Sequence, residues 1–167
     1  KHKNHKIVLK AINVLKRKGK EVFVTFTGKI HDYRNPEYFD ELNKLAKESG
    51  IQSNISFLGF ISREDQLSLM KNAAAVIQPS LFEGWSTVVE DVKSLKAKII
   101  VSDINVHKEQ LASYRGKFFF DPRDELQLAE CMENALRSHE PVIYDYQMDI
   151  LKYGKAFSTI IDDIIKK

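Results

Sequence analysis

Short apolar runs alternate with longer segments of helical periodicity along most of the chain. The runs at 22–27, 55–58, 75–78, 99–102 and 117–120 have the length of buried strands. Between the runs, apolar residues recur at helical spacing, as in the set Val8, Ala11, Ile12 and Leu15. Strands that each lead into a helix are typical of βαβ units. The pattern therefore predicts an α/β protein, a three-layer α/β/α sandwich around a mainly parallel sheet.

Polar residues mark the starts of the predicted helices. Asn35 followed by Pro36 predicts an N-cap and a first-turn proline for a helix that carries Tyr38, Leu42, Leu45 and Ala46. Ser62 with Asp65 three residues later predicts the start of a helix around Leu67 and Met70. Asp124 predicts the start of another helix. Its apolar positions are Ala129, Met132 and Leu136.

The pattern changes after Pro141, where no further strand is predicted. A terminal helix carries an isoleucine-rich stripe, formed by Phe157, Ile160, Ile161, Ile164 and Ile165. Such a stripe needs a surface to cover it. The sequence holds no internal repeat and no linker-like stretch, so we expect residues 1–167 to form a single domain.

Composition narrows the class of protein. With 43% hydrophobic and 29% charged residues in a 167-residue chain, this is an ordinary globular sequence rather than a disordered or fibrous one. The 26 Lys and Arg against 23 Asp and Glu give +3, which is too small to indicate nucleic-acid binding. The single Cys131 allows no intrachain disulfide and favours a reducing compartment. We therefore expect a cytoplasmic protein with no nucleic-acid partner.

The carboxyl ends of the predicted strands are where a ligand should bind in an open α/β sheet. No Gly-x-Gly-x-x-Gly follows a strand, and no loop ends in Gly-Lys-Ser/Thr, so neither a dinucleotide dehydrogenase nor a P-loop enzyme is supported. A phosphorylatable receiver domain needs an acidic cluster at these ends, whereas the clear strand-end acids are only Asp103 and Asp121.

The segment 78–91 runs from a strand through a loop into a helix. A helix that starts at a strand's carboxyl end points unpaired amides and the positive end of its dipole toward the ligand crevice. Gly84, Ser86 and Thr87 are small enough to let a phosphate approach those amides.

Two adjacent acids on this helix are predicted to differ in role. Three apolar residues define its buried side: Val88, Val92 and Leu95. Asp91 falls on that side, where an acid needs a partner, unless it is a shallow carboxylate favoured by the helix dipole. Glu90 stands three residues after Thr87, which predicts a structural capping box.

At this point the residues resemble a known family. The segment Phe-Glu-Gly-Trp-Ser-Thr-Val-Val-Glu-Asp at 82–91 is similar to the Glu-x7-Glu motif of the group 1 (family 4) glycosyltransferases. Leu58-Gly59, Gln78-Pro79-Ser80 and Asp121-Pro122 fall where that family has comparable landmarks. The resemblance covers nearly the whole chain and implies a Rossmann-like fold, the C-terminal donor-binding half of a GT-B enzyme.

The resemblance also implies roles for particular residues. Glu83 is implied as the catalytic-site acid that contacts hydroxyls of the donor sugar, and Asp91 as the acid that holds the ribose. Asp91 departs from the motif's glutamate by one methylene. The other donor-binding residues are implied as phosphate contacts at Lys3, Gly84, Ser86 and Thr87 and nucleobase contacts at Phe60 and Ile61. The alternatives are a terminal lysine without function at Lys3 and core packing for Phe60 and Ile61.

The activity implied is the retaining transfer of a hexose from a UDP- or GDP-hexose, with no metal or other cofactor required. An N-terminal Rossmann-like domain of the same polypeptide, absent from this chain, would bind the acceptor. Any association with the inner face of the membrane would come through that domain, and cell-surface polysaccharide synthesis is the implied setting. We expect this chain alone to bind nucleotide and to turn over little.

Two other classes of function stay open at this point. One is half of a sugar-nucleotide epimerase or phosphorylase, which shares the two-domain plan. The other is a non-catalytic interaction domain, which the change of glutamate to Asp91 favours. His107 either faces the crevice or is a capping or solvent-exposed histidine.

Overall fold

The structure is a computed structural model that describes residues 2–29 and 35–165. Its five described strands are all parallel to their neighbours. They are β1 (Val24–Thr27), β2 (Ile55–Gly59), β3 (Val76–Gln78), β4 (Ile99–Ser102) and β5 (Lys117–Phe120). Each predicted strand is confirmed, with ends that differ by no more than two residues.

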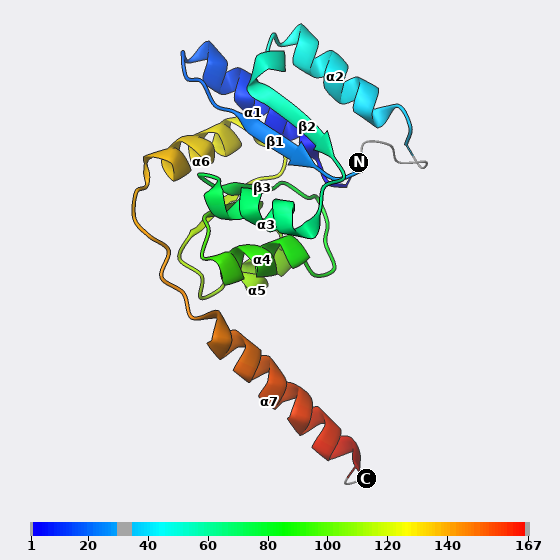
Figure 1. Ribbon diagram of the computed structural model, residues 1–167, viewed down its shortest axis with the longest axis vertical. Coiled ribbons are helices and arrows are strands. Elements are labelled where there is room, and N and C mark those ends of the chain that lie inside the picture. The colour runs from blue at the N-terminus through cyan, green and yellow to red at the C-terminus, as the bar shows by residue number, and fades with distance from the viewer. Residues whose placement is uncertain (1, 30–34, 166–167) are drawn as a thin grey trace.

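The strands form two sheets (Figure 1). β1 pairs with β2, and β4 lies between β3 and β5. In the second sheet Ile100 of β4 is in register with Ile77 on one side and Phe118 on the other. Among the described residues no strand pairing joins the two sheets. The parallel arrangement is as predicted, although in two sheets rather than one.

The side chains of β4 show that helices cover both faces of the three-stranded sheet. Ile99 and Val101 pack in a core with Val89 and Val92 of α4 (Thr87–Leu95). Ile100, which points to the opposite face, packs in a second core with residues of α1 (His5–Arg17) and α6 (Glu125–Arg137). Because successive strand residues face opposite sides, this division confirms the three-layer α/β/α arrangement.

The remaining described helices and their caps test the predicted helix starts. The elements are α2 (Tyr38–Glu48), the short 3-10 helix η1 (Gln52–Asn54), α3 (Arg63–Asn72) and α5 (Asn105–Gln110). Ser62 caps α3 and Asp124 caps α6, as predicted. The cap predicted at Asn35 is wrong, because the Tyr38 N–H donates to the Asn35 carbonyl at 3.2 Å and closes a turn before the helix begins.

Helix α7 (Tyr146–Ile165) extends away from the rest of the protein (Figure 1). None of its residues is buried, and its apolar stripe is exposed from Phe157 to Ile165. No described helix is both long and apolar enough to cross a membrane. The described part of the chain therefore does not supply the covering surface that the stripe needs.

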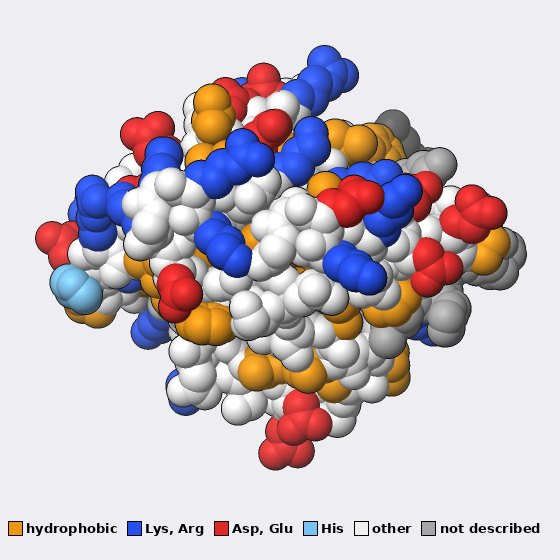
Figure 2. Space-filling view, turned by 90° about the horizontal axis from the view of Figure 1, so that it is seen from above, with side chains coloured by type: hydrophobic (Ala, Val, Ile, Leu, Met, Phe, Trp, Pro, Cys, Tyr) orange, Lys and Arg blue, Asp and Glu red, His pale blue; other side chains and the backbone are white. Residues whose placement is uncertain are grey.

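Basic side chains lie across one face of the molecule with acids among them (Figure 2). Lysines near the start of the chain form ion pairs with acids of other helices. Lys6 pairs with Glu41 of α2, and both Lys18 and Lys20 pair with Glu133 of α6. The positive charge of residues 2–20 is therefore partly balanced by neighbouring acids.

Candidate functional site

Glu83 lies in the loop that joins the carboxyl end of β3 to α4. Its Oε1 accepts hydrogen bonds from Lys3 Nζ at 2.7 Å, Gln78 Nε2 at 2.8 Å and Ser80 Oγ at 2.6 Å. We call these four residues the Glu83 cluster. No described residue donates to Oε2 of Glu83. The carboxylate is held through Oε1, and Oε2 has no partner among the described residues.

The electrostatics of the cluster keep Glu83 ionised. The Glu83 side chain is only 12% exposed, and burial by itself raises the pKa of a carboxyl group. The hydrogen bonds from Lys3 and Ser80 outweigh this effect and hold the pKa of Glu83 below its ordinary value. The site therefore presents a carboxylate whose charge is paired with that of Lys3.

Two contacts hold the residues on either side of Lys3 near the loop that carries Glu83. The Leu81 N–H donates to the His2 carbonyl at 2.8 Å, and Asn4 Nδ2 donates to the Pro122 carbonyl at 2.8 Å. Asn4 adopts a left-handed conformation with φ 55°, which asparagine tolerates better than most residues. The start of the chain is thus fixed between two strand-end loops, and Lys3 is not a terminal residue without contacts.

The start of α4 supplies small, accessible residues next to Glu83. Gly84 and Thr87 are exposed, and a Cβ added to Gly84 would meet no atom within 4 Å. Ser86, in contrast, is buried, and its N–H donates to Gln110 Oε1 at 3.0 Å. The open part of this helix start therefore consists of Gly84 and Thr87.

The capping box predicted for Glu90 and Thr87 is wrong. The N-cap of α4 is Ser86, whose side chain makes no cap hydrogen bond. Glu90 instead accepts hydrogen bonds from Gln110 Nε2 at 2.8 Å and Tyr146 OH at 3.2 Å, and it pairs with Lys93 at 3.2 Å. The interior partners satisfy Glu90 better than one exposed amide would. The structural role assigned to Glu90 stands, with different partners.

The buried side of α4 also differs from the prediction. Its buried residues are Val89, Val92 and Lys93, while Val88 and Leu95 are only partly buried. Asp91 is partly buried as well, with a side chain that is 14% exposed. Both of its oxygens bond to the guanidinium of Arg63, with Nη1 to Oδ2 at 2.8 Å. Asp91 thus has the partner that an acid in this position needs.

The two candidate nucleobase contacts lie between β2 and α3. The Phe60 side chain is 82% exposed, so core packing does not explain it. Ile61 is partly buried. Arg63 follows two residues later and reaches Asp91, so this loop and α4 are linked directly.

His107 is fully buried rather than solvent-exposed or capping. Its Nδ1 lies 2.9 Å from the Ser102 carbonyl, a geometry in which Nδ1–H donates. Nε2 is buried and has no hydrogen-bond partner among the described residues. Burial lowers the pKa of His107, so the ring is neutral. The Ser102 hydroxyl donates to the Ser80 carbonyl, which connects this histidine with the Glu83 cluster.

Sequence reasoning missed two residues of this region. Arg63 and Gln110 are linked to the 78–91 segment by hydrogen bonds from other helices. The cap at Ser62 places Arg63 at the start of a helix, but no local pattern indicates that its side chain meets Asp91. Contacts over 28 and 24 residues leave no periodic signal in the sequence.

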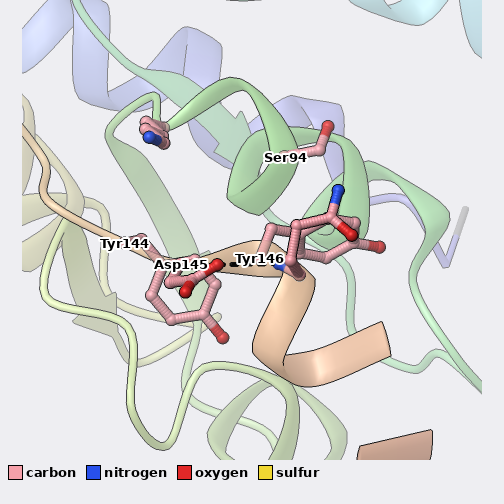
Figure 3. A pocket seen from close by; sticks show the side chains of 6 residues that line it. Ser94, Tyr144, Asp145 and Tyr146 are labelled. Atoms are coloured by element: carbon pink, nitrogen blue, oxygen red, sulfur yellow. Dashed lines mark hydrogen bonds between the residues drawn. The ribbon is translucent and has the colours of Figure 1, made fainter. Parts of the chain in front are cut away.

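A hollow of about 360 Å³ lies at the other end of α4 (Figure 3). It is lined by Ser94, Lys96, Tyr144, Asp145, Tyr146 and Gln147. None of the residues predicted to bind the donor lines it. The described residues bring together no three His, Cys, Asp or Glu side chains that could hold a metal ion.

These features define a Rossmann-like α/β domain with a charged side-chain cluster at the carboxyl end of β3. The chain belongs to the family of group 1 glycosyl transferases, whose model matches residues 1–156. A glycosyltransferase of Methanocaldococcus jannaschii is 24% identical over 91 residues, which cover 54% of this chain and 21% of that protein.

Solved structures share the fold. A glycosyltransferase of Rickettsia africae matches 81% of this chain with a TM-score of 0.71 and 20% identity. HepE of Anabaena, in complex with UDP and glucose, matches 82% with a TM-score of 0.72 and 18% identity. Sucrose-phosphate synthase of Thermosynechococcus elongatus matches 97% with a TM-score of 0.71 and 13% identity. This chain covers only 34%, 36% and 43% of those chains, respectively.

Proposed function

We propose that residues 1–167 are the nucleotide-sugar-binding domain of a retaining hexosyltransferase. The observation that carries the proposal is the Glu83 cluster, an ionised carboxylate with an unused oxygen beside Lys3 and the start of α4. Membership of the group 1 family supports transfer chemistry. The UDP and glucose in the structure of HepE support a nucleoside diphosphate hexose as donor.

Each residue of the site has a role in this proposal. Oε2 of Glu83 accepts a hydroxyl of the donor sugar, while Lys3 and the amides at Gly84 and Thr87 hold the diphosphate. Ser86 shapes this turn from the buried side through its bonds to Gln110. Asp91 accepts the ribose hydroxyls, and Phe60 and Ile61 lie against the nucleobase.

Catalysis by this domain is electrostatic. Negative charge develops on the diphosphate as the bond to the sugar breaks, and a fixed lysine together with helix-start amides stabilises that charge. Glu83 holds the sugar in the reactive orientation. We assign no general base and no metal ion to this domain.

The proposed enzyme includes an N-terminal Rossmann-like domain that binds the acceptor, and the short coverage of the solved relatives supports this. We assign it to the cytoplasm and to the synthesis of cell-surface polysaccharide. The single, buried Cys131 supports a reducing compartment. Contact with the inner face of the membrane would come through the other domain.

Calorimetric titration of this chain with UDP, GDP and ADP, in the presence of a chelator, tests the proposal. We expect saturable binding of UDP or GDP, weakened about tenfold or more by Asp91→Ala because a hydrogen bond to a charged group is lost. Glu64→Gln, which removes an exposed carboxylate on α3, is the matched control and should bind normally. Absence of binding by the wild-type chain contradicts the proposal. Rapid sugar transfer by this chain alone would contradict the proposal that a second domain is needed to bind the acceptor.

A further inference from the structure

Arg63 forms a two-pronged ion pair with Asp91. Nη1 donates to Oδ2 at 2.8 Å, and Nη2 donates to Oδ1, so the planar guanidinium grips both oxygens of the carboxylate. This is the strong, geometrically specific form of an arginine–carboxylate contact. The orientation of Asp91 is therefore set by a residue of α3 and not only by its own helix.

The two partners differ in exposure. The Asp91 side chain is 14% exposed, whereas that of Arg63 is 58% exposed. A ligand that reaches Asp91 therefore meets the guanidinium as well. Each carboxylate oxygen has two lone pairs, so each can accept one hydrogen bond from Arg63 and a second from a ligand hydroxyl. The ion pair leaves Asp91 able to bind a diol.

The pair also links α3 to α4. A single exposed ion pair adds little to stability, whereas a two-pronged arginine–carboxylate pair can add more, so the test needs a readout that a structural link alone would not change. Asp91 has a short side chain with few rotamers, and a two-pronged contact removes the remaining freedom of its carboxylate. The loop that leads into Arg63 also carries the exposed Phe60. The pair thus lies between the two segments that are proposed to hold a nucleoside.

We propose that Arg63 is a positioning residue of the nucleotide site, which holds the Asp91 carboxylate in the orientation that accepts both ribose hydroxyls. The inference rests on the proposed function and adds one property to it. Arg63, acting through Asp91, sets the preference of the site for ribonucleotides over nucleotides that lack the 2′ and 3′ hydroxyls.

The test compares UDP and GDP with their 2′,3′-dideoxy forms by calorimetry on the whole chain. We expect the wild-type chain to prefer the ribonucleotide by about tenfold or more, because two hydroxyl contacts to a charged group are at stake. Arg63→Ala should lose most of that preference while its affinity for the dideoxy form stays within about twofold. Arg63→Lys, which keeps the charge without the fork, should recover only part of it. Lys71→Ala, a matched loss of charge on the same helix, should behave as wild type.

A double substitution shows whether Arg63 acts through Asp91. The Arg63→Ala/Asp91→Ala chain should discriminate no less than Asp91→Ala alone, since the same interaction is lost only once. If Arg63→Ala keeps the full ribonucleotide preference, or weakens both forms of nucleotide equally, the role of Arg63 is overturned while the nucleotide site stands. If the wild-type chain binds none of these nucleotides, the proposed function fails, and this inference fails with it.

Discussion

Two clusters that each pair a lysine with carboxylates lie at different places along α4. The Glu83 cluster lies before its first turn and includes Lys3, whose side chain is 45% exposed. The second, which we call the Lys93 cluster, consists of Glu90, Lys93, Tyr144, Tyr146 and Asp149. The Lys93 side chain is only 2% exposed. Each cluster includes residues of the segment 78–93, but the lysine is exposed in the first cluster and buried in the second.

The main difference lies in the surroundings of the lysine. Lys93 Nζ lies 2.7 Å from Asp149 and 3.2 Å from Glu90, and it faces the rings of Tyr144 and Tyr146. Burial lowers the pKa of Lys93, but these two acids outweigh that effect and raise it. In the Glu83 cluster all three described contacts use one oxygen. Each cluster also contains an acid oxygen with no partner among the described residues, Oε2 of Glu83 and Oδ1 of Asp149. The exposure of the lysine therefore distinguishes the candidate site from an internal anchor.

The contrast also explains why two neighbouring acids differ in role. Glu90 belongs to the Lys93 cluster and contacts Tyr146 at the base of α7, whereas Asp91 contacts Arg63 on α3. Successive helix residues point about 100° apart, so adjacent positions reach different neighbours. A motif read along the sequence cannot show which of the two acids faces the ligand.

Lys93→Ala should give the largest effect on folding. The substitution leaves Glu90 and Asp149 close together with no cation, and breaking a buried pair in this way costs about 3 to 5 kcal/mol. Urea unfolding followed by circular dichroism measures the loss. Lys71→Ala, an exposed lysine of α3, is the control and should stay within about 0.5 kcal/mol of wild type. An equally small loss for Lys93→Ala would show that the cluster is not a structural anchor.

Asp149→Asn should have a smaller effect, confined to the base of α7. It removes the charge that pairs with Lys93 and accepts from Tyr144, at a cost of about 1.5 to 3 kcal/mol for a hydrogen bond to a charged group. We expect faster hydrogen exchange in the first turns of α7 and unchanged nucleotide binding. Asp145→Asn, an acid just before α7 that lies outside this cluster, is the neighbouring control. Weaker nucleotide binding in Asp149→Asn would mean that the two clusters are not independent.

Glu83→Gln should show the reverse pattern. The fold should change by less than about 1 kcal/mol because Gln can keep the accepting oxygen. Affinity for UDP-glucose or GDP-mannose should fall about tenfold, while affinity for the corresponding nucleoside diphosphate changes much less, because Glu83 contacts the sugar. Calorimetry with each pair of ligands measures the difference. Equal losses for both ligands would move the role of Glu83 from the sugar to the phosphates.

The smallest effect concerns pH. Burial lowers the pKa of His107, and burial together with nearby positive charge lowers the pKa of His5 from 6.5 to about 4. Each histidine binds a proton less readily in the folded state than in the unfolded chain, so stability should fall as the pH drops through 6.5. For His5 we expect a loss of about 1 kcal/mol between pH 6.5 and 5.5, and His107 should add to the loss in the same direction.

Variants show whether the loss of stability at low pH comes from the histidines or from the Lys93 cluster. His107→Asn and His5→Phe should each flatten the fall in unfolding free energy between pH 6.5 and 4.5, measured by urea titration at several pH values. Asp149→Asn should leave that slope unchanged, because the lowered pKa of Asp149 acts only below its ordinary value of 3.8. If Asp149→Asn changed this slope and the histidine variants did not, the loss of stability in acid would come from the Lys93 cluster and not from the histidines.

Much of the fold could be predicted because its signals are local. The strands, the caps at Ser62 and Asp124 and the terminal helix depend on runs and spacings within a few residues. The buried face of α4 could not be predicted in the same way. Apolar spacing indicated only Val88, Val92 and Leu95, yet Lys93 is buried as well because two acids and two aromatic rings surround it. A hydrophobic pattern counts apolar residues and cannot anticipate a buried ion pair.

The sequence by itself determined the order of strands and helices, the strand-end position of Glu83 and the family resemblance, since each depends on neighbouring residues. Only the tertiary structure decided that Lys3 meets Glu83, that Arg63 grips Asp91 and that Glu90 turns inward toward Gln110. These contacts join residues 80, 28 and 20 positions apart. Their partners are chosen by the packing of helices on the sheets, because hydrogen bonds and ion pairs act over a few ångströms of space and not along the chain.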